Sequence, residues 1–218
     1  TWIQIIAPAQ NSNEYLRWEE KHETNVGLDF SMLNSRITGS IDVYNRDING
    51  LLYDYAVPSP PSLYTTTRAN VGKMRNRGVE VLLSFNPVRK KDFNWTTSIN
   101  FSTNSNKLIS LSNELYQSSS DYFMTGWISE PVKTESHIVK VGDKIGNFYG
   151  FKVIDIADDG KWIYEDKDGN AVAYDDFSRA FQDKKVIGNG LPKWYAGWNH
   201  SFQYKQFDLN ISMRGAFD

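Results

Sequence analysis

Residues 93–102 read Phe-Asn-Trp-Thr-Thr-Ser-Ile-Asn-Phe-Ser, and this stretch decides the fold. Because side chains on a β-strand alternate between its two faces, the residues of one parity share a face. One parity is apolar apart from a single threonine: Phe93, Trp95, Thr97, Ile99 and Phe101. The other parity holds only asparagine, threonine and serine. The stretch therefore predicts a strand with one apolar face, about as long as a tilted strand that crosses a bilayer.

The same alternation recurs along the chain and predicts an all-β, antiparallel up-and-down meander. The predicted strands cover residues 22–32, 37–46, 77–86, 93–102, 194–204 and 207–217. The links within each successive pair of strands are short, whereas residues 47–73 and 103–192 form long links. Short turns on one rim and long loops on the other are typical of an outer-membrane barrel, with the long loops extracellular.

The second long link is too long for a simple loop. Within it, residues 146–153 and 161–164 resemble strands, and a turn follows at residues 166–169. We therefore predict a small hairpin subdomain inside this loop, with a short helix over residues 174–184.

The composition excludes several classes of protein. The chain has 218 residues, a net charge of -2 and no basic block, which argues against an electrostatic nucleic-acid binder. No run approaches 18 apolar residues, so a transmembrane helix is excluded, whereas barrel strands dilute their apolar residues one to one. The absence of cysteine removes disulfides and thiolate sites. The 7 Trp, 12 Tyr and 12 Phe suit cross-strand pairs or membrane-interface girdles.

Several segments, taken in order and spacing, resemble the carboxy-terminal part of the SusC/RagA-type TonB-dependent transporters of the outer membrane of Bacteroidota. The similarity covers nearly the whole chain. The matching segments are Trp18–Glu19, Thr24–Asp29, Gly39–Arg46, Asn70–Gly72, Asn76–Glu80, Phe101–Asn104, Ile145–Gly150 and Gly190–Pro192.

The resemblance implies a 22-stranded barrel with an amino-terminal plug and a TonB box, capped by a SusD-like surface lipoprotein. It implies uptake of glycans, or of peptides in some members, driven by the proton-motive force through the TonB complex. Six strands do not close such a barrel, and the sequence shows no plug or TonB box. We therefore expect a wall segment, truncated at both ends, that sits in outer-membrane lipid, has no cofactor and is not an enzyme.

Two groups of residues are candidates for contact with cargo or lumen. The loop aromatics Tyr122, Trp127, Tyr149 and Trp162 are predicted to stack on substrate, although packing of the loops against one another explains them equally well. A second group has the inward parity, so we expect its members to line the lumen, paired with one another or with a plug. These residues are Asp29, Asp42, Arg46, Glu80 and Arg214.

No catalytic or metal site is predicted. His22, His137 and His200 have no metal-type partner at i+2 or i+4. Residues 166–170 begin like a calcium loop, but Phe177 stands where the bidentate glutamate belongs. Asp-Gly turns that close hairpins explain this segment more simply.

A soluble β-sandwich, such as a carbohydrate-binding module, is the alternative from another class. Its strands are usually shorter, about five to six residues. The two predictions differ in where the apolar parity lies. A sandwich buries Trp95, Ile99, Phe101, Leu209 and Ile211 between two sheets, whereas a barrel turns them outward.

Overall fold

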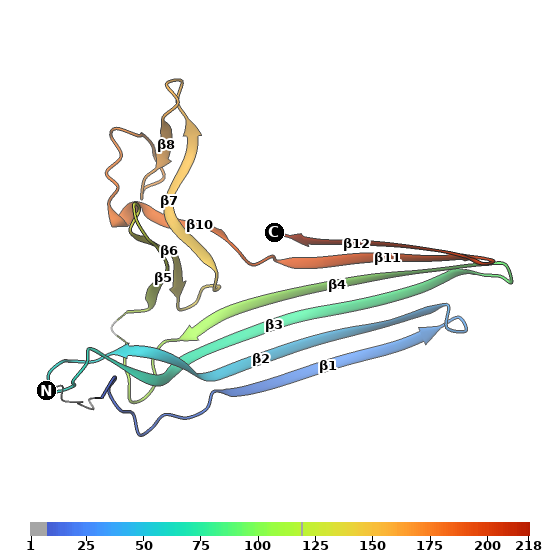
Figure 1. Cartoon of the computed structure of the whole chain (residues 1–218), viewed down its shortest axis with the longest axis horizontal. Helices are drawn as coiled ribbons and strands as arrows, with labels where there is room; N and C mark the ends of the chain where they lie inside the picture. The colour runs from blue at the N-terminus through green and yellow to red at the C-terminus, as the bar shows by residue number, and fades with distance from the viewer. Residues whose placement is uncertain (1–7, 119) are drawn as a thin grey trace, which may run out of the picture. The chain divides into compact units, whose positions relative to one another are not determined.

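The computed structural model describes residues 8–118 and 120–218, and its regular structure is almost entirely β (Figure 1). The chain divides into two compact units. The first, here called the wall unit, comprises Lys193–Asp218 and the described residues before 119. The second, the loop unit, comprises Ser120–Pro192. No helix in the described part of the chain has the length and hydrophobicity needed to cross a bilayer.

The wall unit is one antiparallel sheet in the order β1-β2-β3-β4-β11-β12. Tight turns join β1 to β2, β3 to β4 and β11 to β12 at one end, which we call the turn end; the opposite end is the loop end (Figure 1). This arrangement confirms the predicted all-β, up-and-down meander. The strands are β1 (Glu20–Met32), β2 (Ile37–Ala56), β3 (Thr66–Arg89), β4 (Phe93–Ser110), β11 (Trp194–Tyr204) and β12 (Phe207–Phe217).

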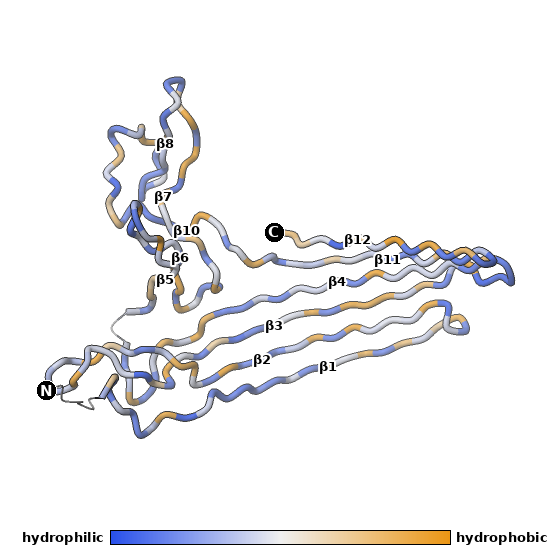
Figure 2. The backbone as a smooth tube through the Cα atoms, in the orientation of Figure 1, coloured by the Kyte–Doolittle hydropathy of each residue, from blue (hydrophilic) through white to orange (hydrophobic). Residues whose placement is uncertain are grey.

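The apolar parity of these strands is exposed. Hydrophobic and hydrophilic residues alternate along the strands in Figure 2. Val26 is 70% exposed and Leu209 is 57% exposed, and Ile99, Phe101 and Ile211 are exposed as well. These side chains do not pack in a dry interior, so the sandwich alternative is wrong for this sheet.

Two aromatic layers bound this apolar face. In the layer near the loop end, which we call the outer aromatic layer, Trp194 stacks on Phe217 with ring centroids 4.0 Å apart. Near the turn end, Trp95 stacks on Phe202 at 5.7 Å. Trp194 and Phe202 are eight positions apart on β11, which is about 26 Å along the strand, or about 20 Å of height at the usual tilt of about 40°. That height approaches the apolar band of about 25 Å in an outer-membrane barrel. We take the segments between the two layers as membrane-spanning.

Three strands continue past the predicted bounds at the loop end, so the predicted loop limits of 47–73 and 103–192 are wrong. The irregular segments are residues 57–65 and the stretch after Ser110. The extended ladder holds opposite charges across from each other, such as Asp47 with Arg75 and Asp54 with Arg68. Beyond the bilayer neither face needs to be apolar, so the extension lacks the alternation that marks the rest of the wall.

The loop unit has a sheet of its own, which is larger than the predicted hairpin. Its strand order is β5-β6-β7-β8-β9, and β10 pairs with β7. The rings of Phe151, Tyr164 and Phe177 form its core, with Tyr164 stacked on Phe177 at 4.3 Å. The predicted helix over 174–184 is wrong, because that stretch holds the 3-10 turn η1 (Phe181–Asp183) and no other helical residue. The strands are β5 (Tyr122–Ile128), β6 (Thr134–Lys140), β7 (Asn147–Ile156), β8 (Trp162–Glu165), β9 (Ala171–Ala173) and β10 (Lys184–Asn189).

Candidate functional site

The five residues predicted to line the lumen lie on β1, β2, β3 and β12, but among the described residues they do not pair with one another. Arg46 instead binds Glu23, with its Nη2 atom 3.0 Å from Oε1. Asp42 lies directly opposite Glu80 in the β2–β3 register, which places two carboxylates side by side. Asp29 is opposite Ser40, and Arg214 is opposite Gly197. No salt bridge thus joins two members of the group among the described residues, and their pairing with a plug stays a prediction.

The four aromatics predicted to contact substrate all belong to the loop unit. Tyr122 and Trp127 are on β5, Tyr149 is on β7 and Trp162 is on β8. Trp127 is 66% exposed and Trp162 is 53% exposed. Tyr149 packs its ring against Phe181, and partial burial raises the pKa of its phenol. No ring contact joins any two of the four in the described structure, so they do not form one aromatic cluster.

The histidines and the aspartate-rich turn have ordinary surroundings. His200 lies among the rings of Trp95, Trp198 and Phe202 on the apolar parity. The Oδ1 atom of Asp166 accepts hydrogen bonds from the backbone N–H groups of Asp168 (2.9 Å) and Asn170 (2.8 Å), which is an Asx turn. Within the described ranges, no group of three or more histidine or carboxylate side chains is placed to hold a metal ion.

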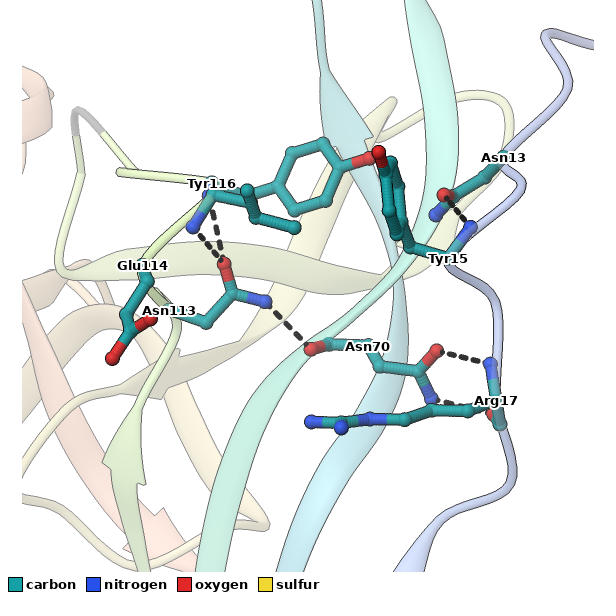
Figure 3. A pocket seen from close by; sticks show the side chains of 8 residues that line it. Asn13, Tyr15, Arg17, Asn70, Asn113, Glu114 and Tyr116 are labelled. Atoms are coloured by element: carbon teal, nitrogen blue, oxygen red, sulfur yellow. Dashed lines mark hydrogen bonds between the residues drawn. The ribbon is translucent and has the colours of Figure 1, made fainter.

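A pocket that the sequence did not predict lies at the loop end of the wall unit, with Asn70 of β3 at its centre (Figure 3). Its volume is about 540 Å³. Asn70 is only 7% exposed. Its Oδ1 atom accepts from the N–H of Arg17 at 2.9 Å, and its Nδ2 atom donates to the carbonyls of Arg17 (2.8 Å) and Gly50 (2.7 Å). We call this cavity the Asn70 pocket.

Gly50 supplies one of those carbonyls from an irregular point in β2. The pairing of β2 with β3 shifts register between Asn49 and Leu51, so Gly50 is an extra residue in the ladder. Its φ of +69° lies in the left-handed region that favours glycine. This local backbone turns the Gly50 carbonyl toward the amide of Asn70.

Residues 8–19, here called the strap, form one wall of the Asn70 pocket. The Asn11 amide donates to the carbonyls of Tyr64 (2.7 Å) and Thr66 (2.9 Å), and the Asn13 amide donates to that of Arg68 (2.8 Å). The strap then passes to β2, where the Glu19 carboxylate accepts from the N–H of Leu52 at 3.0 Å.

The opposite wall is the segment that follows β4. The Asn113 amide donates to the carbonyl of Asn70 at 2.9 Å, and its Oδ1 atom accepts from the N–H of Tyr116 at 2.7 Å. The carbonyls of residues 66, 68 and 70 belong to alternate residues of β3, so they point to the same edge of that strand. β4 stops pairing with β3 at Lys73. Asparagine amides therefore cover the edge that β4 leaves, and they hold both walls to β3.

Four polar groups of the Asn70 pocket take no part in the hydrogen bonds that hold its walls. They are the guanidinium of Arg17, the carboxylate of Glu114 and the hydroxyls of Tyr15 and Tyr116. None of them makes a hydrogen bond or ion pair with another residue in the described part of the chain. In Figure 3 the Tyr116 ring points toward Tyr15, and the Arg17 side chain runs below Asn70 toward the wall that carries Glu114. The pocket thus presents a cation, an anion and two phenols to solvent.

The sequence does not predict the Asn70 pocket, because the parts of the pocket are far apart along the chain. Asn70 itself was within a segment of the family resemblance, Asn70–Gly72, but its partners Arg17 and Asn113 are 53 and 43 positions away. A signal was present in the closely spaced asparagines Asn11 and Asn13, which lie outside any predicted strand. Asparagines of this kind often hydrogen-bond backbone groups, yet the sequence does not show which ones.

The surrounding ladder is strongly charged. The Nε atom of Arg75 is 2.6 Å from an oxygen of Asp47, and that of Arg68 is 2.9 Å from an oxygen of Asp54. Hydrogen bonds from Arg68 hold the pKa of the Asp54 carboxyl below its usual value, and those from Arg75 do the same for Asp47. Both pairs lie beyond the outer aromatic layer, where charge is solvated.

Comparison with known proteins finds relatives along nearly the whole chain. A family model described as TonB dependent receptor-like, beta-barrel matches residues 4–213. The TonB-dependent receptor SusC of Bacteroides thetaiotaomicron is 32% identical over 211 residues, which cover 94% of this chain and 20% of that protein. The TonB-dependent receptor P39 of Formosa agariphila is 29% identical, with 94% of this chain and 22% of that protein covered.

Solved structures show the same fold. The RagAB peptide importer in its open-open state superposes with a TM-score of 0.75 at 21% identity, covering 93% of this chain and 21% of that one. The closed-closed state of that importer gives a TM-score of 0.70 at 24% identity. The chain spans about a fifth of the length of the curated relatives it matches.

Proposed function

Because the chain belongs to the TonB-dependent receptor β-barrel family, of the SusC/RagA type, we propose that it forms part of the wall of an outer-membrane importer of glycans or peptides. The location in the bacterial outer membrane follows from the family. The relatives are receptors and transporters, and the chain is not an enzyme. The proposal includes a closed barrel of 22 strands, a SusD-like lipoprotein lid, and contact with the TonB complex through a plug region.

The observation that carries the proposal is the exposed apolar face of the wall unit. A one-layer sheet with side chains such as Val26 and Leu209 in contact with solvent would not be stable in water. Its outer strands, β1 and β12, also leave one edge each without a partner in this sheet. Lipid on the apolar face and further barrel strands on both edges remove both problems.

The loop end supports a role in contact with cargo and lid. The charged extension of β2 and β3 reaches past the outer aromatic layer, and the Asn70 pocket opens there. The loop unit presents exposed apolar side chains, among them Trp127, Val132 and Trp162. We propose that these contact the lipoprotein or the cargo, together with Tyr122 and Tyr149, and that Asp29, Asp42, Arg46, Glu80 and Arg214 line the lumen.

The proposal is tested with the protein at the full length that its gene encodes, in a Bacteroidota host. We expect it to fractionate with the outer membrane and to copurify with a surface lipoprotein. A variant in which a short Gly-Ser linker replaces residues 120–192 should still insert but should lose the lipoprotein. The proposal is wrong if the protein is recovered in soluble periplasm. It is also wrong if residues 1–218 alone form a soluble monomer that unfolds cooperatively without detergent.

A further inference from the structure

The Asn70 pocket is preformed. The amides of Asn13, Asn70 and Asn113 are all occupied by backbone groups, and these bonds hold the strap and residues 113–116 at fixed places on β3. A ligand that enters does not have to order these walls, so the entropic cost of binding is reduced. The same bonds mean that the three amides shape the cavity and have little capacity left for a ligand.

The groups that are left for a ligand have opposite charges. Arg17 and Glu114 line one cavity, yet they form no ion pair with each other, and neither has another described partner for its side chain. A solute with one anionic and one cationic end can satisfy both through charge-assisted hydrogen bonds, which are about twice as strong as neutral ones. A neutral sugar could donate to Glu114 and accept from Arg17, but it would leave both charges uncompensated.

The size of the Asn70 pocket suits a short solute of this kind. A volume of 540 Å³ corresponds to a space about 8 Å across, if its three dimensions are equal. Two residues of extended chain span about 7 Å. The rings of Tyr15 and Tyr116 flank this space and offer apolar faces to small side chains.

We propose that the Asn70 pocket binds a short peptide with free termini, of about dipeptide size, with Arg17 holding its carboxylate and Glu114 its ammonium group. This inference rests on the proposed function, because it makes the outer end of the wall a place where peptide cargo is held. It adds a requirement that the proposed function lacks, namely recognition of both charged ends.

The test is a titration of the full-length protein in detergent with dialanine and its three capped forms, monitored by saturation-transfer NMR. The forms are N-acetylated, C-amidated and doubly capped dialanine, and maltose serves as a neutral sugar probe. We expect dialanine to bind, either single cap to weaken binding at least about tenfold, and the double cap to abolish it.

Two variants assign each end of the peptide to one side chain. In Arg17→Gln, amidation should no longer matter, whereas acetylation should still weaken binding. In Glu114→Gln, the reverse should hold. Matched charge removals in the loop unit, Lys133→Gln and Glu130→Gln, should leave all four affinities unchanged, because those two side chains pair with each other far from the Asn70 pocket in sequence.

Three outcomes overturn the inference: doubly capped dialanine binds as well as the free form, dialanine does not bind at millimolar concentration, or maltose binds in a manner that depends on Arg17 and Glu114. These outcomes are separable from failure of the proposed function. If the protein still reaches the outer membrane and copurifies with its lipoprotein, only the assignment of the Asn70 pocket fails.

Discussion

Replacing Asn70 by alanine should loosen the strap without unfolding the wall. The substitution removes three hydrogen bonds of 2.7–2.9 Å from a side chain that is 7% exposed. A net contribution of about 0.5–1.5 kcal/mol for each bond gives a loss of about 1.5–4.5 kcal/mol. Water can reach the loop end and solvate part of the freed backbone, so we expect about 2–3 kcal/mol. The loss should be local, because β3 keeps its ladder with β2.

Hydrogen exchange measured by mass spectrometry on the protein in detergent reports this local opening. A loss of about 2–3 kcal/mol predicts amide exchange in residues 8–19 that is faster by about 30- to 150-fold, with no change in residues 93–102. Asn25→Ala is the matched control, because Asn25 makes a single 3.4 Å bond to Asp42 on an exposed face. Exchange of the strap at the wild-type rate in Asn70→Ala would refute the role given to Asn70. Equal acceleration throughout the wall would refute its local character.

Three further predictions concern the wall. Met213→Arg should destabilise the inserted barrel by about 2–4 kcal/mol, because Met213 lies opposite Trp198, midway between the two aromatic layers, and the change places a charge on the lipid-facing parity near the bilayer midplane. Ser212→Arg on the other parity should be tolerated, and the yield of heat-modifiable barrel in the outer membrane measures both. Gly78→Val should lower the free energy of unfolding by about 1–3 kcal/mol in a urea titration, because a Cβ atom at Gly78 would lie 2.4 Å from both the Tyr44 ring and the Thr103 carbonyl. In the control Gly150→Ala, the Cβ atom meets only Ile187 at 3.7 Å, so the loss of stability should be small. Arg68 lowers the pKa of Asp54, so the stability that this pair contributes is complete above the usual pKa of 3.8 and is lost as the pH falls through the lower pKa of the folded state. Both side chains are more than half exposed, so Asp54→Asn should cost at most about 1 kcal/mol at pH 7. Hydrogen exchange in residues 50–70 measures this cost.

The membrane-facing part of the wall could be predicted from the sequence. Every outward side chain between the aromatic layers faces the same apolar solvent, and every inward one faces water or polar groups. The period of two on β11 and β12 therefore shows the faces of these strands without knowledge of their neighbours. The pairing within each pair of strands could also be predicted, because a tight turn such as residues 205–206 makes the two strands antiparallel neighbours.

Past the outer aromatic layer the alternation of apolar and polar residues ends, and only the tertiary structure shows which residues meet. The extension of β2 and β3 is held by register-dependent pairs such as Asp54 with Arg68, and neither residue indicates its partner in the sequence. The Asn70 pocket needs Arg17, Gly50 and Asn113 to meet at one residue of β3. A local pattern records the environment that a side chain faces, whereas a hydrogen bond to a particular distant carbonyl depends on which segments folding brings together. The alternation along the chain thus determined the wall, and the folded arrangement of the loop end determined the pocket.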